Sequence, residues 1–161
     1  MSNMPMVRLS NMTQAQYPGY RDWFIEEYAR DLSTNHGYAM AQGRINAAAS
    51  IEGYLPQGVA SAGHSLYCID TDHDQQTQQV VGYLWIGYKA DSAFIYDFCI
   101  LPPWQRRGYG SAALFLLDKV MRDRGVSELG LRVAADNPQA KALYDKCGFL
   151  VTGVNMAKSL L

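Results

Sequence analysis

The sequence predicts a single domain of the mixed α/β class, and two observations support this prediction. Segments with the apolar period of an amphipathic helix alternate along the chain with short apolar runs that suit strands. A central stretch, 94–125, passes from an apolar run through a glycine-containing turn into a helix. The chain has 161 residues, of which 48% are apolar and 18% charged, so it is long enough for one domain with its own core.

Apolar periodicity and turn residues mark the individual elements. The strands are expected at 6–10, 65–69, 80–88, 94–101 and 129–133, with a last hairpin formed by 149–154 and 155–158. The helices are expected at 17–32, 38–54, 110–124 and 138–147. Asn11 to Thr13 should cap the first helix, Gly125 should end the third, and Asn137 with Pro138 should start the fourth.

The turn Gln105-Arg106-Arg107-Gly108-Tyr109-Gly110 carries the clearest chemistry. Its glycines allow a tight turn, and the helix that follows supplies unpaired N–H groups and the positive end of a dipole. One apolar face specifies that helix, formed by Ala113, Leu114, Leu117, Val120 and Met121. The pattern indicates an anion site suited to phosphate. The alternative interpretation is an ordinary strand-to-helix turn that binds nothing.

Two blocks of the sequence resemble the GNAT acyltransferases. The turn matches that family's Gln/Arg-x-x-Gly-x-Gly/Ala signature, with an apolar strand before it and a long helix after it. Downstream, Asp136-Asn137-Pro138, Ala140, Leu143-Tyr144, Lys146 and Cys147-Gly148-Phe149 are similar to the second block, usually Asn-x-x-Ala-x-x-Leu-Tyr-x-Lys-x-Gly-Phe. A joint match at this order and spacing is specific. Pro102-Pro103-Trp104 departs from the family, which more often has Pro-Glu-Tyr there.

The resemblance implies a GNAT fold and a site for acetyl-coenzyme A. The fold would be a twisted, mostly antiparallel mixed sheet of about six or seven strands with helices on both faces, splayed where strands 94–101 and 129–133 run parallel. The cosubstrate would enter that splay. Its pyrophosphate would lie on main-chain N–H groups of Gln105, Arg106, Arg107, Gly108, Tyr109, Gly110 and Ser111, its pantetheine along Ile100 and Leu101, and the remainder beside Asn137, Ala140 and Tyr144.

The implied activity is direct transfer of the acetyl group to a primary amine in a ternary complex. Asp97 interrupts an otherwise apolar strand, either as a carboxylate satisfied by backbone N–H groups or facing water at a groove, or as the catalytic base. Glu26 and Glu27, on the polar face of the first helix, are alternative contacts for the amine. Tyr144 would protonate the departing thiolate, although its apolar stripe alone indicates a core tyrosine. A non-catalytic acyl-coenzyme A sensor of the same fold is the alternative function.

Two other phosphate-binding classes are excluded by context. Gly108-x-Gly110-x-x-Ala113 fits the dinucleotide fingerprint, but the residues 102–107 separate its first glycine from the strand. Glu128, near the expected spacing for a ribose-binding acid, precedes the next strand instead of ending it. A P-loop would need Gly-Lys-Ser or Gly-Lys-Thr after the turn, and neither is present.

No metal is expected. Asp70, Asp72 and Asp74 imitate the opening of a calcium loop, but neither the required glycine nor the required glutamate follows at the right position, so a solvated loop is favoured over 70–79. The three cysteines lack metal-ligand spacing and are expected as core thiols: Cys68, Cys99 and Cys147.

The charge and hydropathy of the sequence limit the partners and the cellular compartment that are expected. Fourteen basic and fifteen acidic residues give a formal net charge of -1, so neither a nucleic acid nor a membrane is expected as a partner. No apolar run has the length of a membrane span and the start lacks a signal peptide, so a cytoplasmic protein is expected. The acceptor, a small molecule or a protein amine, is not specified, and a homodimer is left open.

Overall fold

The computed structural model describes residues 4–71 and 78–161, and over these residues it confirms the mixed α/β class. Its helices are α1 (Tyr17–His36), α2 (Met40–Tyr54), α3 (Tyr109–Asp123) and α4 (Pro138–Lys146), with short 3-10 turns at Gly58–Ala60 and Pro102–Trp104. Each predicted helix is present near its predicted position. Most of the loop that imitates a calcium site lies outside the described residues. None of the helices described is both long and apolar enough to cross a membrane.

In the part of the chain that the structure describes, a single sheet contains five strands in the order β1-β2-β3-β4-β5. They are β1 (Arg8–Asn11), β2 (His64–Thr71), β3 (Gln79–Lys89), β4 (Ser92–Ile100) and β5 (Glu128–Leu131). Neighbours are antiparallel except β4 and β5, which are parallel. This confirms the mostly antiparallel sheet with one parallel pair, but the number of strands is lower than the predicted six or seven.

The missing strands are those of the predicted C-terminal hairpin. Gly148 ends α4 with a φ of +94°, and the chain from Phe149 to Leu161 then continues without regular secondary structure. Leu150 and Met156 are 85% and 92% exposed, so the segment buries neither side chain against its own domain. An isolated two-stranded hairpin is marginal in water unless it packs on something. The prediction of strands at 149–154 and 155–158 is therefore wrong for this chain.

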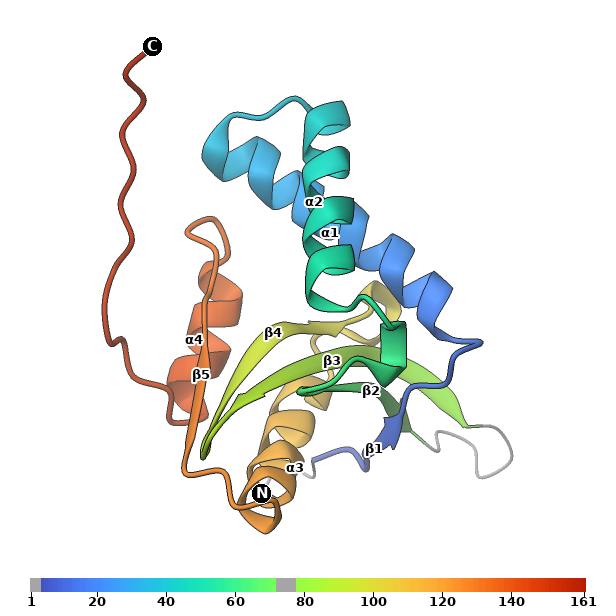
Figure 1. Ribbon diagram of the computed structural model, residues 1–161. Helices are drawn as coiled ribbons and strands as arrows, with labels where there is room; N and C mark the ends of the chain where they lie inside the picture. Colours follow the sequence, from blue (N-terminus) through green and yellow to red (C-terminus); the bar gives the residue numbers. More distant parts are fainter. Residues whose placement is uncertain (1–3, 72–77) are drawn as a thin grey trace.

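The sheet separates two cores, one on each face (Figure 1). On one face, α1 and α2 cover a cluster that includes Tyr20, Ile51 and Trp85. On the other, α3 supplies Leu114 and Leu117 to the larger cluster. Figure 1 shows α4 beside β5, at the flank of the sheet. The prediction of helices on both faces is therefore confirmed.

Local signals fix most of the helix ends, with one correction. Asn137 caps α4 by accepting a hydrogen bond from the backbone N–H of Ala140 at 3.1 Å, as predicted. Gly125, with a φ of +82°, follows the end of α3, also as predicted. Thr13 does not cap α1 directly. It exchanges hydrogen bonds with Gln16 in a capping box that closes the turn just before α1 begins.

Candidate active site

The strands β4 and β5 separate part of the way along the sheet. Their pairing runs from Ser92 with Glu128 to Ile95 with Leu131, and β4 then continues to Ile100 without β5 beside it. A pocket of about 150 Å³ opens where they part. Four of the predicted site residues line it together: Asp97, Asn137, Ala140 and Tyr144. The predicted splay is therefore present, and side chains from β4 and α4 meet in it.

A bulge in β4 determines which way Asp97 points. Trp85 of β3 pairs with Asp97, but the next residue, Ile86, pairs with Ile95, which leaves Tyr96 as an extra residue. Ahead of the bulge Ile95 packs in the α3 core, whereas beyond it Phe98 occupies that side. Because one inserted residue reverses the alternation, Asp97 is turned toward the face covered by α1. A regular strand would have aimed this carboxylate into the α3 core.

On that face, Asp97 meets a tyrosine that sequence reasoning missed. The hydroxyl of Tyr20, in the first turns of α1, donates a hydrogen bond of 2.7 Å to Oδ2 of Asp97. The Tyr20 side chain is fully buried and packs against the ring of Tyr83 at 5.0 Å between centroids. The available signal was weak: Tyr20 precedes Phe24 by one helical turn on the apolar face, a spacing that indicates core packing and not a polar partner.

The surroundings of Asp97 change its acidity. Removal from water raises the pKa of the Asp97 carboxyl to about 6, and the negative charge of Glu27 acts in the same direction. The hydrogen bonds from Tyr20 and from the backbone N–H of Phe98 favour the carboxylate and oppose that shift. The outcome is a carboxylate that is mostly ionised at neutral pH and still basic enough to take a proton.

Tyr144 faces the same pocket from α4. Its ring packs near Phe98 and Phe149, with centroids 6.3 Å and 5.6 Å away. Burial, followed by the charge of Asp97, raises the pKa of Tyr144 well above its usual range. The phenol is therefore protonated at every physiological pH. The inward orientation predicted from the apolar stripe of α4 is confirmed.

The turn before α3 is tight and leads into a helix start without a side-chain cap. Gly108 adopts a φ of +85° and Arg106 a φ of +64°, which wraps the chain tightly ahead of the helix. Within the described residues, no side chain caps the first N–H groups of α3, which begins at Tyr109. The amide N–H of Ala112 is bonded to the carbonyl of Gly108 at 3.1 Å, so the free donors lie ahead of it, including Ser111.

Packing explains other residues of this turn. A Cβ on Gly110 would lie 3.0 Å from Cδ2 of Leu143, so this glycine lets α4 approach α3 closely. The side chain of Gln105 donates to the carbonyl of Ile100 at 2.8 Å and braces the turn against the end of β4. The N–H of Leu101 donates to Val81 in β3, on the side of β4 away from the splay. Gln105, Ile100 and Leu101 thus have structural contacts of their own.

Aromatic side chains pack beside the turn, although Pro102-Pro103-Trp104 differs from the family's more common Pro-Glu-Tyr. The Trp104 ring meets Tyr109 nearly edge-on, with centroids 5.6 Å apart. The guanidinium carbon of Arg107 lies over the Trp104 ring, 5.7 Å from its centre. The expected aromatic packing of Trp104 is confirmed, while Arg106 and Arg107 are exposed and leave a local positive charge at the turn.

The two glutamates of α1 have different surroundings. Glu26 bonds to Arg44 of α2, with 2.8 Å between Oε1 and Nε, and this bond lowers the pKa of Glu26. Glu27 pairs with Arg30 at 2.5 Å, and its charge is close enough to raise the pKa of Asp97. Of the two glutamates proposed to contact an amine, Glu27 is the one electrostatically linked to the pocket.

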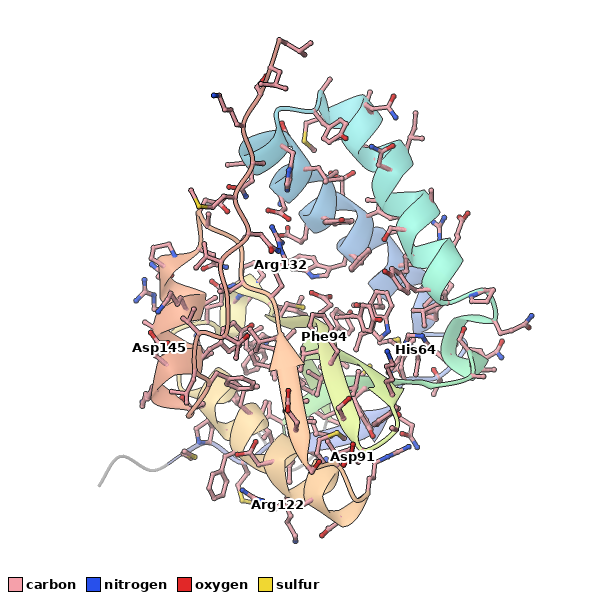
Figure 2. The ribbon with its side chains drawn as sticks, turned by 60° about the vertical axis from the view of Figure 1, so that its left-hand side comes forward. His64, Asp91, Phe94, Arg122, Arg132 and Asp145 are labelled. Atoms are coloured by element: carbon pink, nitrogen blue, oxygen red, sulfur yellow. The ribbon has the colours of Figure 1, made fainter. Side chains whose placement is uncertain are left out.

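The end of α1 is tied to the loop that follows β5. Asn35 donates to Oδ1 of Asp136 at 2.8 Å, and Arg132 approaches Asp31 at 3.5 Å. Figure 2 shows Arg132 at the end of β5 nearest α1. These contacts join segments about a hundred residues apart in the sequence, and Arg132 is itself one of the residues that line the pocket. No pattern in the sequence predicts these contacts.

The cysteines are reduced and poorly reactive. Burial raises the pKa of Cys68 to about 11 and also raises those of Cys99 and Cys147. Since the thiolate is the nucleophilic form, none of the three is activated. Among the described residues, no three side chains from His, Cys, Asp and Glu gather as metal ligands.

The structure combines a sheet that splays between β4 and β5, a basic glycine turn before α3, and a pocket lined by a carboxylate and a phenol. This combination indicates a class, the acetyltransferases of mixed α/β fold. The chain belongs to the acetyltransferase (GNAT) family, whose model matches residues 13–149. It is 28% identical over 158 residues to the uncharacterized N-acetyltransferase YycN of Bacillus subtilis, covering 96% of this chain and 99% of that protein.

Two solved structures and a further relative in sequence are also similar to this chain. The crystal structure of YycN matches with a TM-score of 0.88 and 29% identity over 97% of this chain and 99% of that one. Ribosomal protein bS18-alanine N-acetyltransferase of Escherichia coli is 41% identical over 59 residues, 37% of this chain and 40% of that protein. Spermidine N-acetyltransferase from Vibrio cholerae, solved with CoA and spermine, shares the fold, with a TM-score of 0.63 and 16% identity over 91% of this chain and 82% of that one.

Proposed function

We propose that the protein transfers the acetyl group of acetyl-coenzyme A directly to a primary amine while both substrates are bound. The observation that carries this proposal is the meeting of Asp97 and Tyr144 in one pocket at the splay. A carboxylate from β4 and a phenol from α4 line this pocket. Direct transfer needs both, because the amine loses a proton and the thiolate gains one.

The turn and the start of α3 would hold the pyrophosphate of the cosubstrate. The uncapped N–H groups of Tyr109, Gly110 and Ser111 point out of the helix end, and the exposed Arg106 and Arg107 add positive charge. The pantetheine would then run through the splay toward the pocket lined by Asn137 and Ala140, as the family resemblance implies. The side-chain oxygen of Asn137 is used by the helix cap, which leaves its amide N–H groups for a ligand.

In the proposed reaction, Asp97 takes a proton from the acceptor ammonium, through a water molecule where the amine does not reach it. The neutral amine attacks the thioester carbonyl, and a tetrahedral intermediate with a positively charged nitrogen forms. The nitrogen loses a second proton to solvent, and the C–S bond breaks as the carbonyl reforms. Tyr144 donates its hydroxyl proton toward the departing sulfur and regains a proton from solvent. Of the two protons that the ammonium nitrogen loses, one is matched by the proton on the coenzyme A thiol, and the other is released through Asp97. The acetyl group passes directly to the amine, so no covalent enzyme intermediate forms.

The high pKa of Tyr144 modifies this role. A phenol with an ordinary pKa near 10 is matched to an alkyl thiol, but burial raises the pKa of Tyr144 well beyond that. Complete transfer to sulfur then becomes less favourable, while a hydrogen bond from the phenol to the developing thiolate still stabilises the negative charge. Tyr144 therefore acts chiefly as a hydrogen-bond donor in the transition state.

The acceptor is proposed only as a primary amine. Relatives and fold neighbours carry names that refer to alanine of a ribosomal protein and to spermidine, which differ widely in size. The carboxylates of Glu27 and Asp97 favour an acceptor that arrives as a cation. A panel of polyamines, amino acids, aminoglycosides and peptides, followed by thiol release from acetyl-coenzyme A, tests the proposal. Binding of the cosubstrate with no release for any amine would favour the alternative function, an acyl-coenzyme A sensor.

Tyr144→Phe is expected to lower the rate of acetyl transfer while cofactor affinity and fold stay nearly unchanged. The ring contacts with Phe98 and Phe149 survive in the variant, and only the hydroxyl is lost. Losing one hydrogen bond to a charged group costs about 1.5–3 kcal/mol, or roughly 10–100-fold in rate. Single-turnover transfer at saturating acetyl-coenzyme A measures it. A variant as fast as the wild type would show that Tyr144 is a packing residue.

Tyr20→Phe is expected to move the acidic limb of the rate profile to higher pH. The Tyr20 hydrogen bond stabilises the Asp97 carboxylate and so lowers its pKa, which means that removing the bond raises that pKa above about 6. More of the base is then protonated at pH 6 to 7, and the loss of activity shrinks as the pH rises. The profile of kcat/KM with one amine measures the shift. A uniform loss at all pH values would indicate a purely structural role.

A further inference from the structure

A group of aromatic rings lies on the sheet face that α1 and α2 cover, and the proposed reaction does not use it. Phe94 and Tyr96 of β4 meet nearly edge-on, with ring centroids 5.2 Å apart. Tyr54, the last residue of α2, lies 5.0 Å from the Tyr96 ring. Phe94 is 40% and Tyr54 49% exposed, so two of the three rings present much of their surface to solvent. These three rings form an aromatic shelf.

Buried side chains hold the shelf in place. Tyr96 stacks on the ring of Trp85, with centroids 4.8 Å apart and an angle of 18° between the ring planes, and Trp85 is only 1% exposed. The indole N–H of Trp85 donates to Nδ1 of His64 at 3.0 Å, and Figure 2 shows His64 between the sheet and the helices α1 and α2. A Cβ on Gly87 would overlap the Tyr96 ring. The orientation of Tyr96 is therefore set before any ligand arrives.

The bulge in β4 places the shelf directly beside Asp97. In a regular strand, consecutive side chains point to opposite faces. Because Tyr96 is the extra residue of the bulge, it packs in the cluster under α1 and α2, and Asp97 points to the same face, where it meets Tyr20. Both residues line the pocket of about 150 Å³. Their Cα atoms are about 3.8 Å apart, so an amine at Asp97 has its carbon skeleton within reach of the shelf.

The charges near the pocket lie at its carboxylates and not at the shelf. Burial raises the pKa of the Tyr96 hydroxyl, with a further contribution from Tyr54, and burial lowers the pKa of His64. Among the described side chains, no carboxylate or cation contributes to either shift. His64 is therefore neutral at pH 7. In contrast, the pKa of Asp97 responds to the charge of Glu27. An ammonium group is attracted to the pocket, and an uncharged group suits the shelf.

We propose that the acceptor is an alkylamine that carries an aromatic ring a few bonds from its primary amino group, and that this ring lies on the aromatic shelf. Aromatic rings bury a large apolar area and favour the tilted or offset contacts that the rings of the shelf already make with one another. A polyamine would place a second ammonium group where no carboxylate acts. The inference rests on the proposed acetyl transfer and names the substrate class of that same site.

The test compares kcat/KM for three amines, phenethylamine, n-propylamine and spermidine, each corrected for the fraction of unprotonated amine. Phenethylamine is expected to exceed n-propylamine by about 10-fold or more, because its ring leaves water on the shelf. Spermidine is expected to fall below phenethylamine. Equal or higher values for n-propylamine or spermidine would overturn the inference.

Ring removal tests the shelf itself. Phe94→Ala and Tyr54→Ala are each expected to lower the ratio of kcat/KM for phenethylamine to that for n-propylamine by about 2–10-fold, the effect of losing one aromatic contact. Tyr54→Phe keeps the ring and should keep the ratio. Phe115→Ala is the control, since Phe115 is a 71% exposed ring on α3, the helix that covers the other face. Equal losses for both amines would show that the rings only support the fold, and would overturn the inference.

A binding measurement separates this inference from the proposed function. Titration calorimetry of phenethylamine into the full-length protein with coenzyme A bound does not require turnover, and phenethylamine is expected to bind more tightly than n-propylamine. Tighter binding without acetyl transfer would refute the proposed function and support the aromatic shelf as a ligand site. Binding no tighter than that of n-propylamine would overturn the inference, whether or not either amine is acetylated.

Discussion

Asp97→Asn is expected to lower turnover by about 10²–10⁴-fold, the usual range for removing a general base. The amide keeps the volume of the carboxyl group and can still accept a hydrogen bond from Tyr20, so the packing around α1 and β4 is retained. What is lost is the ability to take a proton. The measurement is kcat with a reactive amine at pH 7, with acetyl-coenzyme A affinity determined in parallel and expected to change little.

The pH dependence of the wild-type rate should also reflect the ionisation of Asp97. Since the pKa of Asp97 is raised to about 6, the carboxylate is the dominant form above that pH and is lost as the pH falls through it. The rate should therefore decline toward pH 5. In Asp97→Asn the deficit should shrink at high pH, where the amine loses its proton without help.

Two further variants make the assignment of the base specific. Glu26→Gln serves as the control, because Glu26 is held by Arg44, and it is expected to leave the rate nearly unchanged. Glu27→Gln removes the charge that raises the pKa of Asp97, so its acidic limb should move to lower pH. Full activity of Asp97→Asn at pH 7 would exclude Asp97 as the base and favour Glu27 or solvent.

Reversing the charge of the turn should weaken acetyl-coenzyme A binding by roughly 10–100-fold, the equivalent of about 1.5–3 kcal/mol for a lost charge-assisted contact. The variant is Arg106→Glu with Arg107→Glu. Both side chains are exposed, so the double change leaves the core intact. Acidic side chains at the start of α3 would repel the pyrophosphate that the helix end attracts. Titration calorimetry gives the affinity directly.

A charge-matched control separates a local site from the overall field. Lys119→Glu with Arg122→Glu makes the same change in net charge on exposed positions later in α3. Its affinity should stay within a few-fold of the wild type, because exposed charges more than about 10 Å apart are largely screened at 0.1 M salt. Equal losses in the two double variants would remove the turn from the cofactor site. A substitution at Gly110 would be harder to interpret, since any side chain there presses on Leu143.

Features governed by local sequence could be predicted. The start of α4 follows from Asn137 and Pro138, and the turn before α3 from the glycines around Tyr109, because caps and positive φ angles are set by single residues. The absence of regular structure from Phe149 to Leu161 could not be predicted this way. Alternation indicates that a segment suits a strand, and it does not indicate whether a sheet edge will pair with it.

The candidate site was predictable only in part for a related reason. Asp97 stood out because a carboxylate in an apolar strand is uncommon. Its partner Tyr20 lies 77 residues away and has the spacing of an ordinary core residue, so the hydrogen bond between them depends on how α1 crosses the sheet. The contacts of Asn35 and Arg132 across the pocket depend on that same crossing. Tertiary geometry decides such pairs.

The bulge at Tyr96 and the orientation of Asp97 depend on each other. Pairing of Trp85 with Asp97 and of Ile86 with Ile95 leaves Tyr96 as the extra residue, so a chain that lost Tyr96 could keep both pairs in a regular ladder, with Asp97 on the α1 face. If Tyr96 stayed and the bulge were straightened, Asp97 would turn toward Leu114 in the α3 core and Phe98 would turn toward α1. During divergence the extra residue and the bulge can therefore be lost only together, because losing the bulge alone would cost the carboxylate and the core at once.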